Sequence, residues 1–212
     1  MLPSQVSAAK DAVRNLGHPA YFTRICRFIH ARNRCSISCM PQGLYRLHQS
    51  GQSHFVTFSC FHRSPRLTSP DACRVFLEAL EAARKRCAMR IYGYVLMPEH
   101  VHLLVSEPEA VPLATAMRFL KVSSAKRTRS EEGGALWQAR YHDRNVRDYD
   151  EFTVKLRYLH RNPVKRGLCT SADEWPWSSF RHYLTGEVGV VEIESEWTVK
   201  RRESGGRIAL PG

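Results

Sequence analysis

The sequence lacks the features that mark membrane-spanning and secreted proteins. It holds no run of 18 or more apolar residues, so we expect no segment that spans a bilayer. The N-terminus has no apolar stretch typical of a secretory signal. Its seven cysteines are odd in number, scattered, and include no C-x-x-C pair. We therefore expect reduced thiols and a cytoplasmic location, without a disulfide framework or a structural zinc site.

Acidic residues are too few to balance the basic ones. There are 32 lysines and arginines against 20 aspartates and glutamates, which gives a formal net charge of +12 and a pI of about 9.7. This surplus predicts a polyanionic partner, with nucleic acid as the first candidate and an anionic membrane surface as the second. The 212-residue chain is 43% hydrophobic, which is enough for a sizeable core.

Three regions are expected along the chain. Residues 1–39 contain one acid and no sustained helical or alternating pattern, so we expect a mobile extension. Translation from Met40 and an arginine-rich transit peptide are alternative explanations of this region. Residues 40–185 are expected to form the functional domain, and residues 186–212 a loose tail.

The apolar pattern switches between strand and helix periods. Strands are predicted at about 54–61, 89–96, 100–105 and 137–146. The second and third strands, joined by residues 97–99, are predicted to form an antiparallel hairpin. Helices are predicted at about 70–87, 113–129 and 148–162, the last ending before Pro163 because proline lacks an amide donor. The stretch 69–71 is predicted to start the first helix, and Asp148 and Glu151 have the separation of a capping box at the start of the last. Through residue 146 the order is β-α-β-β-α-β. We therefore predict an α+β fold with a ferredoxin-like antiparallel sheet, followed by a C-terminal helix.

Two histidines stand in one of the predicted strands. His100 and His102 are separated by one residue, so their side chains project from the same face of the sheet. Two neutral imidazoles side by side are a suitable start for a divalent-metal site. The pattern alone is equally consistent with two solvated strand residues.

A tyrosine and an asparagine share a face of the last predicted helix. Its core-facing stripe is Tyr149, Phe152, Leu156 and Leu159. Tyr158 falls away from the centre of that stripe, and Asn162 follows one turn later on the same side. For the helix alone, a half-buried surface tyrosine with a C-terminal amide cap is the favoured interpretation.

Four ordered motifs resemble those of a known family. They are His100-Val101-His102 after Met97-Pro98-Glu99, and the stretches 137–143 (WQARYHD), 157–167 (RYLHRNPVKRG) and 175–179 (WPWSS). Together they resemble the REP-associated tyrosine transposases, a branch of the single-tyrosine HUH transposases. The resemblance runs from about residue 41 to about residue 183.

The resemblance implies a nuclease that cuts single-stranded DNA through a covalent 5′-phosphotyrosine. Matched position by position, Tyr158 is the nucleophile, His100 and His102 are metal ligands, and Asn162 completes the metal shell. The metal implied is Mg²⁺ or Mn²⁺. The DNA partner implied is a hairpin-forming repetitive element of a bacterial genome, and a monomer is expected rather than a dimer. His160 is expected to point away from Tyr158, and the general base is not identified.

Basic residues are dense around the predicted site, which suits a groove that follows a DNA backbone. The candidate DNA-binding residues are Arg118, Lys121, Lys126, Arg127, Arg140, Arg144, Arg147, Arg157, Arg161, Lys165 and Arg166. Unpaired bases could stack on Trp137, Tyr141, Trp175 or Trp177. For Trp175 and Trp177, burial in the core is the favoured interpretation.

These features together predict a metal-dependent single-strand DNA endonuclease and strand transferase. The main alternative is a catalytically silent DNA- or RNA-binding protein on the same scaffold. The joint presence of two histidines, Tyr158 and Asn162 argues against it. A ferredoxin-like metabolic metalloprotein would leave the basic helices unexplained.

Overall fold

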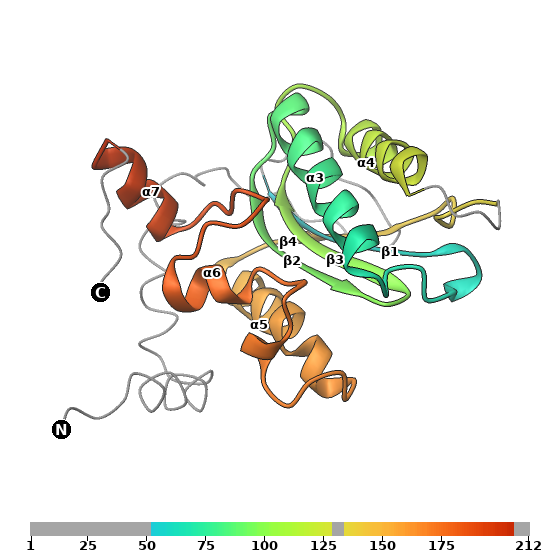
Figure 1. Ribbon diagram of the computed structural model, residues 1–212. Coiled ribbons are helices and arrows are strands. Elements are labelled where there is room, and N and C mark those ends of the chain that lie inside the picture. The colour runs from blue at the N-terminus through green and yellow to red at the C-terminus, as the bar shows by residue number, and fades with distance from the viewer. Residues whose placement is uncertain (1–51, 129–133, 206–212) are drawn as a thin grey trace.

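The computed structural model describes residues 52–128 and 134–205, and its centre is a four-stranded antiparallel sheet (Figure 1). The strands are β1 (Ser53–Ser59), β2 (Ile91–Met97), β3 (His100–Ser106) and β4 (His142–Val146), in the spatial order β2-β3-β1-β4. The helices are α3 (Pro70–Arg86), α4 (Leu113–Arg127), α5 (Tyr149–Lys165), α6 (Phe180–Thr185) and α7 (Glu196–Glu203), with short 3-10 turns η1 (Phe61–Arg63) and η2 (Ala172–Glu174). The predicted β-α-β-β-α-β order through β4 is confirmed.

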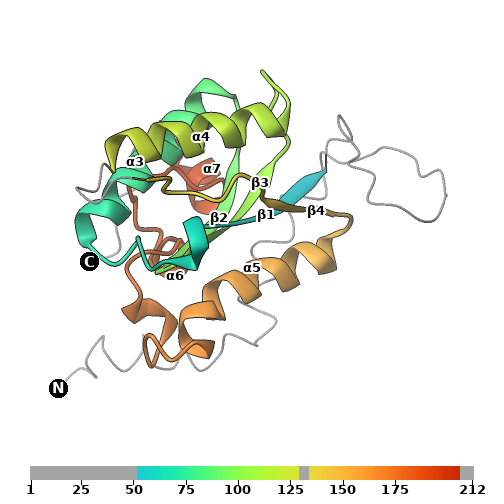
Figure 2. The same cartoon turned by 90° about the vertical axis from the view of Figure 1, so that its right-hand side faces the viewer.

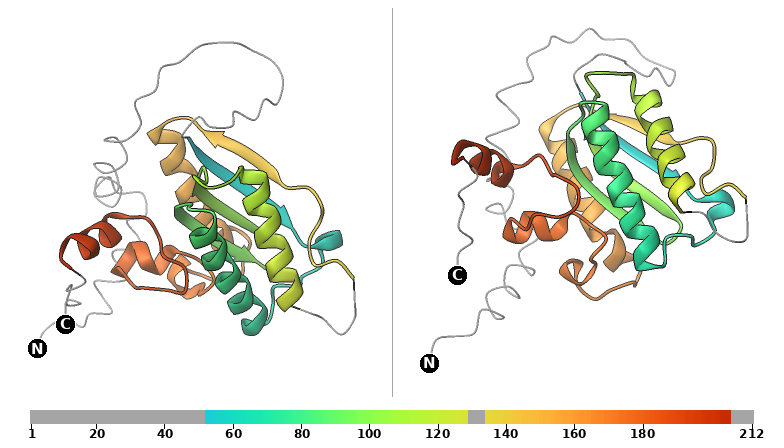
Figure 3. Two further views of the ribbon diagram at one scale, coloured as in Figure 1. Left: turned by 90° about the horizontal axis from the view of Figure 1, so that it is seen from above. Right: turned by 45° about the horizontal axis from the view of Figure 1, so that its top comes forward.

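The sheet separates two layers of helices. Helices α3 and α4 lie side by side on one face, and α5 lies on the other (Figures 2 and 3). On the first face, Phe58 packs against Phe76 of α3 and against Trp137. On the second face, Phe55 contacts His102 and Tyr158 of α5. This division follows from the alternation of side chains along β1, and it sets the histidine side of β3 against α5.

Both predicted helix starts have the expected caps. The Ser69 side chain accepts a hydrogen bond from the Ala72 amide at the start of α3. The Asp148 carboxylate accepts one from the Glu151 amide, at 2.8 Å, at the start of α5. The Glu151 carboxylate accepts instead from the amide of Arg147, so only one of the two bonds of the predicted capping box forms.

The prediction that the last helix ends near Asn162 is wrong, because α5 continues through Pro163 to Lys165. A proline lacks an amide donor and its ring crowds the preceding turn, but here both effects fall in the last turn of the helix. The following turn still closes, since the Arg166 amide donates to the carbonyl of Asn162 at 3.0 Å. Gly167 then reverses the chain with a φ of 68°.

The last strand is shorter than predicted, because β4 begins at His142 and not at Trp137. Trp137 forms an isolated bridge with Cys60, and its ring is buried in the core. The Lys121 ammonium donates hydrogen bonds to the carbonyls of Gln138 and Ala139, so these oxygens bind a side chain and not a neighbouring strand.

The segment after Thr185 packs more closely than the predicted loose tail. Val191 and Ile193 are buried in the core, and residues 196–203 form α7. The outer edge of β2 is paired along its length, with Tyr94 and Leu96 bonded to the chain at 177–179 and Ile91 bonded to Glu194. Residues 206–212 and the predicted extension at 1–39 lie outside the described residues. Among the described helices, none has the length and apolar character to cross a bilayer.

Candidate active site

The two histidines of β3 meet at their ring nitrogens. His100 and His102 project toward α5, and their Nε2 atoms lie 3.0 Å apart. Two ligands in adjacent positions of an octahedral ion, each about 2.1 Å from it, would be separated by about 3.0 Å. The spacing of the imidazoles therefore fits two ligands of one small divalent cation.

Each ring is oriented through its other nitrogen. The Nδ1 atom of His102 lies 2.7 Å from the Thr57 hydroxyl on β1, and that of His100 lies 3.1 Å from a carboxylate oxygen of Glu99. Burial raises the pKa of Glu99, but the hydrogen bond from Arg166 and the charge of the same guanidinium act against this effect, and the pKa is lowered overall. An ionised carboxylate only accepts hydrogen bonds, so Nδ1 of His100 carries the hydrogen and Nε2 keeps its lone pair.

Burial also keeps both imidazoles uncharged. It lowers the pKa of His102 to about 3, an effect to which the neighbouring His100 adds. It lowers the pKa of His100 as well, although the Glu99 carboxylate opposes the shift. At neutral pH both rings are therefore neutral, which is the form that ligates a metal.

Tyr158 packs against one of these two histidines, His102. Its ring meets the ring of His102 edge-on, with centroids 5.5 Å apart and planes 72° apart, and also contacts Phe55. The residue is 40% exposed, so it is held on one side and open on the other. His160 is buried and hydrogen-bonded to the Ser179 hydroxyl at 2.9 Å, as expected for a residue that points away from Tyr158.

Asn162 follows Tyr158 by one helical turn and is buried. Its amide nitrogen has no hydrogen-bond partner among the residues that the structure describes. Rotation of the side-chain amide by 180° exchanges its nitrogen and oxygen. The oxygen can therefore occupy this position as well, where it could ligate a cation. Within residues 52–128 and 134–205, no three His, Cys, Asp or Glu side chains are grouped to hold a metal.

Some of the predicted DNA-binding residues lie on the helix that carries Tyr158. Arg157, Arg161 and Lys165 extend from the same helix, and the Lys165 ammonium lies 5.7 Å from the centre of the Tyr158 ring. The Lys155 ammonium lies 5.1 Å from the Phe55 ring. Two ammonium groups therefore lie near Tyr158 or near Phe55, whose ring Tyr158 contacts.

Two further residues of that set on this face are engaged in ion pairs. Arg144 binds Glu151 at 2.8 Å, and Arg166 binds Glu99 at 2.7 Å. Arg140 and Arg147 flank β4 and are exposed.

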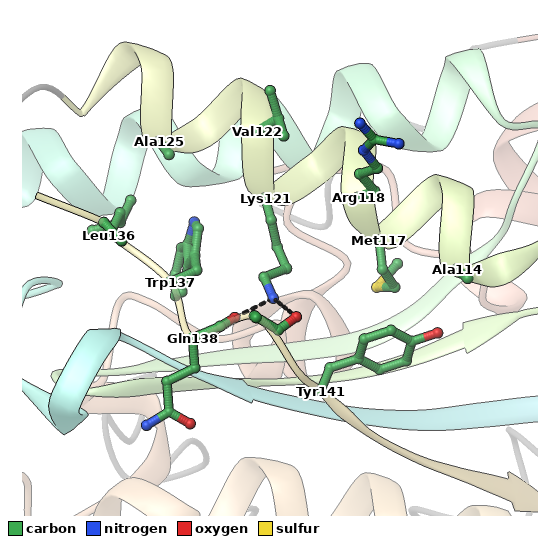
Figure 4. Close-up of a pocket in the computed structure, with 12 residues that line it drawn as sticks. Ala114, Met117, Arg118, Lys121, Val122, Ala125, Leu136, Trp137, Gln138 and Tyr141 are labelled. Carbon is green, nitrogen blue, oxygen red and sulfur yellow. Dashed lines mark hydrogen bonds between the residues drawn. The ribbon is translucent and has the colours of Figure 1, made fainter.

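The structure does not bring the α4 residues to the side of Tyr158. Arg118, Lys121, Lys126 and Arg127 lie on the helix that covers the opposite face of the sheet (Figure 2). Figure 4 shows Lys121 reaching into a pocket of about 430 Å³ between α4 and the chain at 135–141, where it donates to two backbone carbonyls. Burial lowers the pKa of this lysine. Arg127 forms an ion pair with Glu78.

Of the four candidate stacking residues, one is buried in the core and three are partly buried against it. Trp137 is buried, and its indole nitrogen donates to the Ser124 hydroxyl. Trp175 and Trp177 are partly buried against the core, which agrees with the favoured interpretation of these two residues. Tyr141 is also partly buried and lines the pocket beside α4.

Two orienting residues were missed by the sequence analysis. Glu99 directly precedes His100, and this adjacency was a usable signal. Thr57 belongs to another strand, and its place opposite His102 follows from the pairing register of β1 with β3. A register of that kind is not fixed by the pattern of one strand.

Comparisons with known proteins identify the family of this chain. The model of the family "Transposase IS200 like" matches residues 48–162, more than half of the chain. A relative from Escherichia coli, a REP-associated tyrosine transposase, is 23% identical over 136 residues, which cover 64% of this chain and 80% of the relative. A relative from Haemophilus influenzae, provisionally described by the same name, is 29% identical over 106 residues. This match covers 44% of the present chain and 60% of the relative, so the chain spans less than two thirds of that protein.

A solved structure shares the fold. It is that of a REP-associated tyrosine transposase bound to a REP hairpin, with a TM-score of 0.59 and 22% identity over 73% of this chain and 96% of that chain. A four-stranded antiparallel sheet, two histidines on β3 and a tyrosine on the helix across from them occur here within the matched region. The chain therefore belongs to the IS200-like transposase family and resembles its REP-associated tyrosine transposases.

Proposed function

We propose that this protein is a metal-dependent endonuclease and strand transferase that acts on single-stranded DNA at hairpin-forming repeat elements. The observation that carries the proposal is the edge-on contact of Tyr158 with His102, whose Nε2 atom faces that of His100. The proposed nucleophile thus contacts one of the two proposed histidine ligands, and the amide of Asn162 lies one helical turn further along α5. Such a set suits phosphoryl transfer to a side chain.

The reaction proposed is a transesterification. The Tyr158 oxygen attacks a backbone phosphorus, a new O–P bond forms, and the bond from phosphorus to the 3′ oxygen breaks. The phenol loses its proton during attack and the leaving 3′ oxygen gains one, so one strand ends in a free 3′-OH and the other in a 5′-phosphotyrosine. Because the phosphodiester energy is kept, attack by a 3′-OH on this adduct reverses the step and joins strands.

His100, His102 and Asn162 would hold the cation, which we propose to be Mg²⁺ or Mn²⁺. When bound, the ion would neutralise charge on the phosphate as the transition state forms. The chain's own contribution is to keep both imidazoles neutral through burial and to aim their Nε2 atoms at one point. Lys155 and Lys165 supply positive charge next to the tyrosine.

We propose a DNA hairpin as the partner because the relative of known structure was solved with a REP hairpin. Basic residues on both faces of the sheet would allow a folded strand to contact α4 while an unpaired segment reaches Tyr158. A monomer is proposed because the outer edge of β2 is already paired with the chain's own C-terminal segments. Light scattering at several protein concentrations would test the monomer.

The second candidate function is a DNA- or RNA-binding protein without turnover. It is favoured by the small number of ligands, because among the described residues no three His, Cys, Asp or Glu side chains are grouped to hold a metal. A site with so few ligands would bind Mg²⁺ weakly.

One experiment separates the two functions. The protein is incubated with end-labelled, hairpin-bearing single strands and Mn²⁺, and a covalent DNA–protein adduct is sought on a denaturing gel. We expect an adduct from the wild type, and none from Tyr158→Phe, from His100→Ala with His102→Ala, or in excess EDTA. If the wild type shifted the labelled strand on a native gel but formed no adduct on the denaturing gel, the result would support the binding protein.

A further inference from the structure

We propose that Arg166 is a positioning residue, which acts through Glu99 to hold the metal ligand His100 in place. The inference rests on the proposed function and deepens it. It departs from the sequence interpretation, in which Arg166 contacts DNA directly. The observation behind it is that one carboxylate oxygen joins the end of the tyrosine helix to a ligand on β3.

The shared oxygen is Oε1 of Glu99. It accepts a hydrogen bond from a terminal guanidinium nitrogen of Arg166 at 2.7 Å and lies 3.1 Å from Nδ1 of His100. The Glu99 side chain is 16% exposed, so little water competes for it. Its backbone is fixed as well, since the Glu99 carbonyl accepts from the Cys60 amide at 2.9 Å. The Glu99 carboxylate therefore connects the end of α5 with β3.

Arg166 stands at the C-terminal end of α5. Its own amide donates to the carbonyl of Asn162, one turn after Tyr158. The middle of the helix is held by close packing, because Leu156 lies against Gly93 of β2. The start is held by the pair of Arg144 with Glu151. The ion pair of Arg166 with Glu99 joins the C-terminal end of the helix, which carries Tyr158 and Asn162, to the start of β3. This ion pair is called the tie below.

The tie has a chemical effect on His100. A carboxylate that accepts from Nδ1 selects the tautomer in which Nε2 is free, and it makes Nε2 a better ligand. Without Arg166 the carboxylate would lose its second partner and could rotate away from Nδ1. The His100 ring would then populate the other tautomer, in which Nε2 carries a hydrogen and cannot ligate a metal.

The matched variants are Arg166→Gln, Glu99→Gln and their double mutant. Arg166→Gln removes both a possible DNA contact and the tie, whereas Glu99→Gln breaks the tie and removes no positive charge. Arg90→Gln serves as the control, because Arg90 forms a similar pair with Glu109, at 3.0 Å, elsewhere on the surface.

The first readout is the ring ¹⁵N spectrum of His100 in metal-free protein, which needs neither metal nor activity. We expect one tautomer, with hydrogen on Nδ1, in the wild type and in Arg90→Gln, and a mixture in Arg166→Gln and Glu99→Gln. An unchanged His100 spectrum in Arg166→Gln would overturn the proposal.

The second readout is the Kd for Mn²⁺ without DNA, measured by the EPR signal of free Mn²⁺. Loss of such a supporting contact weakens metal binding by about 10–100-fold, so we expect Kd to rise within that range in both single variants. The double mutant should resemble Glu99→Gln, because the two residues act as a unit. A normal Kd for Mn²⁺ in Arg166→Gln together with weaker DNA binding would show that Arg166 contacts DNA only.

The two proposals fail in different ways. If wild-type protein bound no Mn²⁺ and formed no adduct, the proposed function would fail. The ring spectrum of metal-free protein would still decide whether Arg166 orients His100 through Glu99.

Discussion

The rings of Tyr158 and His102 meet edge-on, with centroids 5.5 Å apart. The two residues lie 56 positions apart in the sequence, on α5 and β3, and the same His102 ring stacks on Phe55 of β1. Tyr158 is thus positioned by the rings of two sheet residues, Phe55 and His102. Changes in these two residues, or in how α5 packs on them, should alter the proposed chemistry more than changes on the far face of the sheet.

Thr57→Val should weaken metal binding without unfolding the protein. Valine has nearly the shape of threonine and suits a strand, but it gives no hydrogen-bond partner to Nδ1 of His102. We expect the Mn²⁺ concentration for half-maximal adduct formation to rise by about 10-fold. Thr57→Ser keeps the hydroxyl and should stay near the wild type. Equal metal requirements for Thr57→Val and wild type would show that this bond has no role.

Gly93→Ala should displace the tyrosine helix. A Cβ at this position would lie 2.7 Å from Leu156 Cδ1, so α5 or its leucine must shift. Overpacking of this kind costs about 1–3 kcal/mol of stability, which chemical denaturation would measure, and adduct formation should slow. Gly189→Ala is the control, because its added Cβ would meet nothing closer than 4.0 Å. Rescue of Gly93→Ala by Leu156→Val would assign the effect to this contact, and failure of rescue would count against it.

His160 should make the protein less stable at acid pH. Burial, with a smaller effect of His182, lowers the pKa of His160 to about 3, whereas an unfolded histidine titrates near 6.5. Between these values the unfolded chain binds a proton that the folded chain does not. Stability should therefore fall as pH drops below about 6.5, by roughly 1 kcal/mol per pH unit from this residue.

His160→Gln tests this pH dependence. Glutamine can still bond to the Ser179 hydroxyl but does not titrate. Unfolding by urea at pH 7, 6 and 5 should show a shallower loss of stability in the variant, while the contribution of buried His102 remains. Identical slopes for the two proteins would contradict the assignment.

Basic residues on the two faces of the sheet should have separable effects. Arg161→Gln removes a charge beside Tyr158, so the salt dependence of single-strand binding should fall by about 0.7 in slope, and adduct formation at limiting DNA should drop. Lys121→Met removes the two bonds to backbone carbonyls on the opposite face. It should lower stability by about 1 kcal/mol, with adduct formation at saturating DNA unchanged. A loss of adduct at saturating DNA in Lys121→Met would contradict this separation.

Local signals predicted much of the fold. The caps at Ser69 and Asp148, the β2-β3 hairpin and the common face of His100 and His102 all depend on residues near one another in sequence. The end of α5 lies beyond the predicted one because the lost hydrogen bond and the crowding by the Pro163 ring fall in the last turn, which still closes.

Long-range features could not be obtained in the same way. The contact of Arg166 with Glu99 joins residues 67 positions apart, and the partner of His102 depends on strand register. The placement of α4 on the face away from Tyr158 could be predicted, however, from a general rule of sheet topology. Right-handed crossovers place both helices of a split βαβ unit on one face, which leaves the other face for α5.

The central claim is that Tyr158 becomes covalently bound to DNA. The most direct measurement is mass spectrometry of the proteolysed adduct, formed with a hairpin-bearing single strand and Mn²⁺, to locate the residue that carries the nucleotide. We predict a 5′-phosphate linked to Tyr158 alone, and no linkage in Tyr158→Phe. A nucleotide on another residue, or an adduct of equal yield in Tyr158→Phe, would contradict the account.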